Sequence, residues 1–358
     1  MHLAIFGLTI SSSWGNGHAT LWRALVKALA RRGHTVAFLE RDVPYYAAAR
    51  DGWIPPIGSR ICLYNSVDEV ARQALRECNR ADLAIYTSFC PEGPEFARLI
   101  LDSGAVVKAF YDLDTPITLD AARRGRRVDY LPEDGLGAFD LVLSYTGGKA
   151  LDELKSRLGA RNVLPLYGSV DPESHFPVAP VEYLRGALSY LGTYAADRQQ
   201  GLETMFVAVA RRMTDERFQL AGAQYPEGFP GEPNICFAGH LPPSMHPAFF
   251  CSSRATLNLT RTVMAENGYC PSGRLFEAAA CGTAILSDCW TGLDTFFRPG
   301  AEILLVRGTN DVMDVLSLSD VELRRIGEAA RARVLAEHTA EQRGLQLEAL
   351  CDRVVNAA

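Results

Sequence analysis

Short apolar runs alternate with amphipathic stretches along most of the chain. In the first half these runs are HLAIFGL, TVAFLE, ADLAIYT, AVVKAFYD, FDLVLSY and NVLPLY, and their length and composition are typical of buried strands. Between them the apolar positions follow helical spacing, as they do from Leu21 to Leu29. This alternation predicts βαβ units built on a parallel sheet.

The pattern changes in the proline-rich segment 168–186, which has the composition of a linker. A second series follows, with the apolar runs ALSYLGTY, RFQLAGAQ, NICFAG, ATLNLT, TAILSD and EILLV. We therefore expect an α/β protein of two Rossmann-like, doubly wound domains facing each other across a cleft, with residues 1–172 in the first and 173–358 in the second. The helical stretch at about 320–356 has an uneven apolar face, which leaves open a return of its end to the first domain.

Composition narrows the class of protein. A chain of 358 residues with 48% hydrophobic and 22% charged positions is typical of a globular protein with two domains, and no segment has the apolar length of a membrane span. A net charge of −6 argues against general nucleic-acid binding. The nine cysteines include no C-x-x-C pair and the first ten residues lack the features of a signal peptide, so we expect reduced thiols and a cytoplasmic protein.

The loop SSSWGNGH follows the first predicted strand and leads into a helix. The backbone N–H groups at such a helix start, including those near Gly17, favour a phosphate or another oxyanion. His18 has two interpretations. It is either a polar residue bonded to the local backbone, or an imidazole that acts as a base or grips a substrate.

A dinucleotide site is the main rival for this loop. Its G-x-G-x-x-G pattern is incomplete, because Thr20 stands where the third glycine belongs. Glu40 ends the second strand where an NAD site has an acid, so the rival is weakened and stays open.

Two carboxylates follow the strand AVVKAFYD, namely Asp112 and Asp114. Either is a candidate base, acceptor ligand or structural cap of the loop. A lone D-x-D pattern is a weak signal for a metal. Further along, residues 123–127 contain four arginines, which form either a solvated loop or a grip for an anionic acceptor or membrane surface.

The segment 267–290 carries the clearest binding pattern. Ser272 is a good N-cap, and Gly273 and Arg274 then fall in the first turn of the helix. A cation is unfavourable there unless an anion is also present, and a diphosphate is such an anion. Glu277, one turn further on, can accept hydrogen bonds from both hydroxyls of a ribose.

At this point the sequence resembles a known family. SGRLFEAAACGTAILSD looks like the donor-binding segment of glycosyltransferases with the two-domain GT-B fold, especially the CgeB-like (spore maturation protein) and group 1 members. PLYGSVDPESHFPVAP is similar to their interdomain segment, YLGTYAADRQQGLE to their donor loop, and ICFAGHLPPSMHPAFFCSSRATLNLT to the run before the donor helix. The resemblance spans nearly the whole chain.

The resemblance implies an enzyme that moves a sugar from a nucleoside-diphosphate sugar, UDP-linked by default, to an unidentified acceptor, with no cofactor and no required metal. Their positions after predicted strands make His18, Asp112 and Asp114 the catalytic candidates. The implied donor-binding residues are Gly17, Tyr194, Arg198, Arg261, Ser272, Gly273, Arg274 and Glu277.

One departure from the family pattern matters. Many retaining members carry E-x7-E, and the first glutamate would fall at Tyr269, whereas the nearest acid is Glu266. The stereochemical outcome is therefore open, and two alternatives remain: a sugar-nucleotide epimerase of the same architecture, and a nucleotide-binding protein that has lost turnover.

Overall fold

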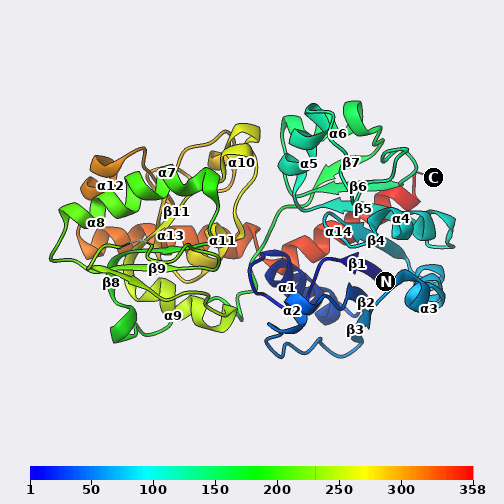
Figure 1. Cartoon of the computed structure of the whole chain (residues 1–358), viewed down its shortest axis with the longest axis horizontal. Helices are drawn as coiled ribbons and strands as arrows, with labels where there is room; N and C mark the ends of the chain where they lie inside the picture. Colours follow the sequence, from blue (N-terminus) through cyan, green and yellow to red (C-terminus); the bar gives the residue numbers. More distant parts are fainter. Residues whose placement is uncertain (230, 358) are drawn as a thin grey trace. The chain divides into compact units, whose positions relative to one another are not determined.

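The structure is a computed structural model, and it describes residues 1–229 and 231–357. The chain forms two compact units (Figure 1). Unit 1 comprises Met1–Ser13, Gly17–Tyr167 and the segment that begins at Ala340, and unit 2 comprises Trp14–Asn16 and Gly168–Thr339. The predicted division at residues 172 and 173 thus lies a few residues after the start of unit 2, and residue 358 lies outside the described part.

Unit 1 is built on a seven-stranded parallel sheet with the order β3-β2-β1-β4-β5-β6-β7. Its strands are β1 (His2–Gly7), β2 (Thr35–Arg41), β3 (Ser59–Tyr64), β4 (Leu83–Thr87), β5 (Val107–Asp112), β6 (Leu141–Ser144) and β7 (Val163–Pro165). Its helices are α1 (His18–Arg31), α2 (Pro44–Ala47), α3 (Val67–Arg80), α4 (Gly93–Asp102), α5 (Thr115–Arg123), α6 (Lys149–Leu158) and α14 (Ala340–Val355).

Both faces of this sheet are buried. Leu3 and Ile5 of β1 enter a core with residues of α1 and α14, whereas Ala4 and Phe6 enter a second core with residues of α3, α4 and α6. A strand that is buried on both sides must be apolar at successive positions. This is why the strands of unit 1 appear in the sequence as continuous apolar runs.

Strand β3 is the exception, and the sequence analysis did not predict it. It lies at the edge of the sheet, where only Cys62 and Tyr64 of its six residues are buried. An edge strand needs less apolar character than a central strand, so its run is short and mixed.

The helical stretch 320–356 forms two helices, α13 (Asp320–Glu337) and α14, separated at His338 and Thr339. Helix α14 packs against α1 within unit 1, as Figure 1 shows by its red ribbon beside the blue one. Arg32 donates to Glu348 at 2.6 Å and Leu347 lies in the core. The end of the chain is therefore part of the first unit.

Unit 2 has a six-stranded parallel sheet with the order β10-β9-β8-β11-β12-β13. Its strands are β8 (Gly186–Leu191), β9 (Phe218–Ala221), β10 (Ile235–Phe237), β11 (Ser253–Asn258), β12 (Ala284–Ser287) and β13 (Leu304–Leu305). Its helices are α7 (Gln199–Leu202), α8 (Ala208–Arg212), α9 (His246–Cys251), α10 (Thr262–Asn267), α11 (Gly273–Ala280), α12 (Thr309–Leu316) and α13, with a π-helical segment, Glu203–Val207, between α7 and α8.

In each sheet the strand order reverses direction at one place, beside β1 in unit 1 and beside β8 in unit 2. Ligands of open parallel sheets bind at such switch points, beyond the carboxyl ends of the strands. The loops after β1, β8 and β11 are therefore the places where function is expected. In the part of the chain that the structure describes, no helix is both long enough and apolar enough to span a membrane.

Candidate active site

The donor-binding prediction centres on Arg274, which lies near the start of α11. Its guanidinium donates to Asn258 Oδ1 at 3.3 Å and stands over the ring of Tyr190, 5.3 Å from the ring centroid. Burial lowers the pKa of Arg274, and the neighbouring charge of Arg198 lowers it further. A cation held in this way is stabilised by an anion that enters the site.

Gly192, at the end of β8, makes room for this guanidinium. A Cβ atom at Gly192 would lie 2.7 Å from Nη2 of Arg274 and 3.0 Å from the hydroxyl oxygen of Tyr190. The hydroxyl of Tyr225 donates to the carbonyl of Gly192 at 3.0 Å, which fixes the loop. The sequence analysis did not single out Gly192, Tyr190, Tyr225 or Asn258, because their role depends on contacts between distant loops.

Arg198 supplies a second cation. It ends the short helical turn Ala196–Arg198 and donates to the carbonyl of Thr193. Its Nε is buried without a hydrogen-bond partner among the described residues. Within residues 1–229 and 231–357, neither Arg198 nor Arg274 forms an ion pair with a carboxylate. Two guanidinium groups that lack a carboxylate partner and influence each other electrostatically can bind a doubly charged anion.

The other predicted donor-binding residues divide into two groups. Tyr194 lies in the same loop as Arg198 and packs edge-on against Tyr225 at 5.7 Å. Arg261, in contrast, has its Nε 3.3 Å from the carboxylate of Asp197. The structure thus pairs Arg261 with an acid of unit 2.

The start of α11 has unused polar groups. Ser272 has the extended conformation of an N-cap residue, but its side chain caps none of the described N–H groups, and Gly273 is the first helical residue. The preceding loop is strained at Tyr269, which has a φ value of +48°. A positive φ in a tyrosine is uncommon and marks a backbone that its surroundings hold in place. Tyr269 occupies the position of the first glutamate of E-x7-E.

Glu277 lies one turn further along α11, beside two histidines that the sequence analysis did not select. Its Oε2 is 3.5 Å from Nδ1 of His246 and 4.0 Å from Nε2 of His175. Burial alone would raise the pKa of Glu277, but the adjacent His175, His246 and Arg274 hold it at about 2. The carboxylate is therefore charged and able to accept hydrogen bonds.

In unit 1 the structure brings His18 and Asp114 together. Nε2 of His18, the first residue of α1, lies 3.0 Å from Oδ2 of Asp114 in the loop after β5. The hydroxyl of Ser88 donates to the same oxygen at 3.0 Å. Nδ1 of His18 is buried and has no hydrogen-bond partner among the described residues. One ring nitrogen is thus oriented by a carboxylate, and the other has no partner among the described residues.

Asp112 lies beneath this pair and is fully buried. Its Oδ1 accepts the backbone N–H of Asp114 at 3.1 Å. Burial, together with the charge of Asp114, raises the pKa of Asp112 to about 7. These contacts fit the structural cap that the sequence analysis kept as one alternative, and they place Asp114 at the imidazole.

Glu40 has a structural role that weakens the dinucleotide alternative. Its fully buried carboxylate accepts hydrogen bonds from the backbone N–H groups of Ile10 and Ser11, at 2.7 and 2.9 Å, and from the hydroxyls of Thr9 and Ser11. Both oxygens hold the loop after β1, so they are not free to bind a ribose. Gly17 precedes α1 and has open space where a Cβ would lie.

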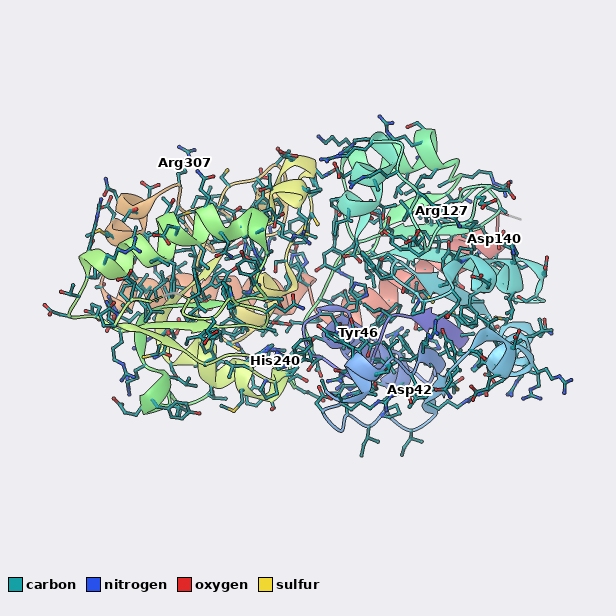
Figure 2. All side chains as sticks on the ribbon, viewed as in Figure 1. Asp42, Tyr46, Arg127, Asp140, His240 and Arg307 are labelled. Atoms are coloured by element: carbon teal, nitrogen blue, oxygen red, sulfur yellow. The ribbon has the colours of Figure 1, made fainter. Side chains whose placement is uncertain are left out.

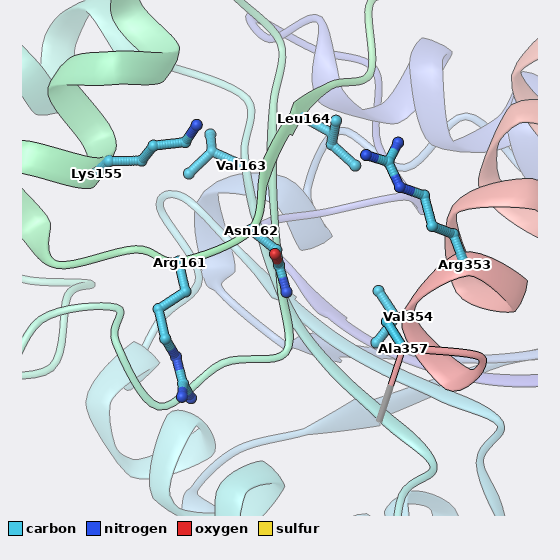
Figure 3. Close-up of a pocket in the computed structure, with 8 residues that line it drawn as sticks. All are labelled: Lys155, Arg161, Asn162, Val163, Leu164, Arg353, Val354 and Ala357. Carbon is cyan, nitrogen blue, oxygen red and sulfur yellow. The ribbon is translucent and has the colours of Figure 1, made fainter.

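The basic loop 123–127 is paired throughout. Arg123 pairs with Glu153, Arg124 and Arg126 pair with Asp120, and Arg127, labelled in Figure 2, lies 3.7 Å from Glu133. This arrangement fits the solvated interpretation. A separate cavity of about 210 Å³ in unit 1 contains none of the predicted site residues (Figure 3). It is lined by Lys155, Arg161, Asn162, Val163, Leu164, Arg353, Val354 and Ala357.

Comparisons with known proteins concern the fold and the family of the chain. Residues 198–349 match the family described as glycosyl transferase-like. No curated protein matches the sequence. Sucrose-phosphate synthase from Thermosynechococcus elongatus is similar over 100% of both chains, with 17% identity and a TM-score of 0.72.

Two further structures contain nucleotides. The Anabaena protein HepE in complex with UDP-glucose matches 99% of this chain and 100% of its own, with 11% identity and a TM-score of 0.66. The catalytic domain of starch synthase IV from Arabidopsis thaliana, bound to ADP and acarbose, matches 99% of each chain, with 13% identity and a TM-score of 0.69. At such identities the similarity establishes the fold.

The fold is therefore GT-B, with two parallel-sheet α/β units. Together with the matched glycosyl transferase-like region, it supports a transferase enzyme.

Proposed function

We propose that the protein transfers a sugar from a nucleoside-diphosphate sugar, UDP-linked by default, to an acceptor hydroxyl or amine, and that it is closest to the CgeB-like members of its class. The observation that carries the proposal is the pair of cations Arg198 and Arg274, which lack carboxylate partners in the described residues and lie where the chain leaves β8 and enters α11.

In this proposal unit 2 binds the donor. The diphosphate lies at Arg198, Arg274 and the first N–H groups of α11, whose dipole favours an anion. Glu277 accepts hydrogen bonds from the hydroxyls of the ribose. Tyr194 lies in the same loop as Arg198, with its aromatic ring against Tyr225. The two guanidinium groups neutralise the charge that develops on the leaving nucleoside diphosphate, so the transfer needs no metal at the diphosphate.

Unit 1 binds and activates the acceptor. Asp114 orients the imidazole of His18, and the free ring nitrogen takes the proton of the acceptor as it attacks the anomeric carbon. The C–O bond to the diphosphate breaks in the same step, and the leaving group departs with its electron pair. The nine cysteines contain no C-x-x-C pair, which fits a reducing compartment, and we propose the cytoplasm.

The test is a calorimetric titration of the full chain with UDP, GDP, dTDP, ADP and CMP, each with and without Mg²⁺. We expect one nucleoside diphosphate to bind more tightly than the others, with little effect of Mg²⁺. If none binds at millimolar concentration while NAD(H) does, the proposal is wrong and the loop after β1 is a dinucleotide site.

A second assay separates the alternatives. The preferred donor is incubated without acceptor and its sugar is analysed by NMR. An epimerised sugar identifies an epimerase, whereas a donor that stays unchanged until an acceptor is added identifies a transferase. Binding without any turnover over an acceptor panel that includes sugars, phosphosugars and peptides identifies a protein that has lost activity.

A further inference from the structure

Three potential metal ligands converge in unit 2, and they come from three separate segments. His175 lies in the loop that follows the bridge at Val170, His246 begins α9, and Glu277 lies on α11. Nε2 of His175 is 3.4 Å from Nδ1 of His246. Oε2 of Glu277 lies 3.5 Å from the His246 nitrogen and 4.0 Å from the His175 nitrogen. Each residue offers one ligand atom to the same small volume.

A hydrogen bond outside this triangle orients His246. Its Nε2 lies 3.3 Å from the carbonyl oxygen of Leu241, which can only accept a hydrogen bond. Nε2 therefore donates to this carbonyl, and Nδ1 is the ring nitrogen that faces Oε2 of Glu277 at 3.5 Å.

The dimensions of the triangle fit a zinc ion. Ligand atoms bound at 2.0–2.2 Å to a tetrahedral Zn²⁺ lie roughly 3.3–3.6 Å from one another. Two of the observed edges, 3.4 and 3.5 Å, fall in this range, and the third, 4.0 Å, closes with a shift of a few tenths of an ångström. Two histidines and one glutamate, with the fourth position open, form one of the ligand sets that zinc uses in proteins.

We propose that His175, His246 and Glu277 form a binding site for a divalent transition-metal ion, with Zn²⁺ as its best-fitting occupant. The sequence analysis expected no metal, and it had no means to find this site. His175 and His246 are 71 positions apart, so no short spacing motif marks them.

The surroundings of the three residues support the site. The hydrogen bond from His246 to the Leu241 carbonyl is the outer contact that orients a ligating imidazole. The loop before His175 is a closed turn, because Asp171 accepts the backbone N–H groups of Glu173, Ser174 and His175. His175 is only 2% exposed, and the side chains of His246 and Glu277 are 12% and 13% exposed. The ligands are thus held by packing and remain reachable from one side.

A bound metal would determine which oxygen of Glu277 is available to other partners. Coordination through Oε2 fixes the carboxylate on α11 and leaves Oε1 available to another partner. In addition, the ion would tie the loop at His175 to α9 and α11 within unit 2.

The experiment measures metal binding in the absence of any nucleotide, so its outcome does not depend on the proposed transferase activity. The full chain is treated with a chelator, dialysed and titrated with Zn²⁺ by calorimetry, and its metal content is then measured by inductively coupled plasma mass spectrometry. We expect one Zn²⁺ per chain with a dissociation constant in the micromolar range or tighter. The absence of a stoichiometric site in the folded wild-type protein would overturn the proposal.

Variants assign the site. His175→Asn and His246→Gln should each weaken Zn²⁺ binding at least 100-fold, while His240→Gln, which alters an exposed histidine of the same unit (labelled in Figure 2), should leave it unchanged. Cys289→Ser controls for binding by the exposed thiol. If either ligand variant binds Zn²⁺ as the wild type does, the metal lies elsewhere and the assignment is wrong.

A spectroscopic readout keeps the test decisive if a ligand variant does not fold. Co²⁺ added to the metal-free wild type should give the absorption bands of a nitrogen- and oxygen-ligated, low-coordinate site, and Zn²⁺ should displace them at one equivalent. A spectrum of hexa-aqua Co²⁺ alone would contradict the site without any substitution.

Discussion

Nε2 of His18 lies 3.0 Å from Oδ2 of Asp114, although 96 positions separate the two residues in the chain. The sheet order explains this contact, because β1 and β5 both pair with β4 and end at the same edge. His18 begins the helix after β1, and Asp114 follows β5. The carboxylate orients the imidazole, as the proposed role of His18 as a base requires.

Substitution of His18 by alanine should therefore slow sugar transfer without weakening the binding of the donor. We expect the turnover number to fall by about 10²- to 10⁴-fold, the usual contribution of a general base. The dissociation constant of the donor nucleotide should stay within a factor of about two, because the residues proposed to bind its diphosphate and ribose lie in unit 2. Asp114→Asn should cause a smaller loss with the same pattern. Steady-state kinetics and calorimetry measure both quantities.

The matched control is Asp152→Asn, which changes an exposed aspartate of α6 in the same unit. It should behave as the wild type. Full activity in the His18→Ala variant would remove His18 from the catalytic role.

Arg274 should contribute to the binding of the diphosphate and not to that of the nucleoside. Arg274→Ala removes a buried guanidinium that the proposal places on the diphosphate, and a hydrogen bond to a charged group contributes about 1.5–3 kcal/mol. We expect the affinity for the nucleoside diphosphate to fall by roughly 10- to 150-fold. The affinity for the corresponding nucleoside should change much less, since it has no phosphate to lose contact with.

Arg211→Ala is the control for Arg274, because Arg211 is an exposed arginine of the same unit that pairs with Glu203 and Glu232. Its loss should leave nucleotide binding unchanged. Equal weakening of the nucleoside and the diphosphate in the Arg274→Ala protein would mean that this residue supports the fold of the loop instead of binding phosphate.

Gly192 gives a test of position without any loss of charge. In a Gly192→Ala protein the new methyl group would overlap Nη2 of Arg274, the far end of a flexible side chain, at 2.7 Å. The guanidinium can move aside, so thermal unfolding should change little while the affinity for the diphosphate falls. Gly222→Ala should act differently, since its methyl group would lie 1.9 Å from the carbonyl oxygen of Gly192, and backbone cannot move as easily. That variant should be strongly destabilised.

Comparison of the two glycine variants separates site geometry from folding. If Gly192→Ala lowers the melting temperature as much as Gly222→Ala does, the contact with Arg274 is not what requires a glycine there.

The sequence predicted the elements whose burial is uniform. Strands such as β1 and β5 are buried on both faces, so their apolar runs are unbroken and easy to recognise. The edge strand β3 was missed because it mixes exposed and buried positions. The break at His338 and Thr339 was also missed, since the helical pattern continues on both sides and only the packing of α14 in unit 1 separates the two helices.

Site residues within one continuous motif could be predicted, whereas their partners from distant segments could not. Arg274 and Glu277 could be selected because they follow a helix cap in one continuous motif. Their partners, such as Asn258 and the two histidines beside Glu277, could not be selected because they lie far away in the sequence. The local sequence could not distinguish Asp112 from Asp114 as the candidate base. Only the burial of Asp112 and the contact of Asp114 with His18 distinguish the two.

Asp112 leads to a prediction about pH and stability. Burial and the charge of Asp114 raise its pKa from 3.8 to about 7 in the folded protein, whereas the unfolded chain keeps the ordinary value. Between these two values the folded state holds a proton that the unfolded state has released. The stabilisation from the neutral carboxyl is therefore fully present below pH 4 and is lost as the pH rises toward 7. Asp112→Asn keeps the acceptor for the Asp114 N–H and removes the ionisation.

We expect the free energy of unfolding of Asp112→Asn, relative to the wild type, to increase with pH by up to about 1.4 kcal/mol per unit across this range, and to level off above it. Urea unfolding at intervals from pH 4 to 8 measures the difference, with Asp152→Asn as the variant that should show no such trend. In an Asp114→Asn background the Asp112→Asn difference should level off at a lower pH, because Asp112 loses its negative neighbour and its folded pKa moves toward the ordinary value. A difference that stays constant over the whole range would show that Asp112 is already ionised in the folded protein at pH 4 and that its burial is compensated by other groups.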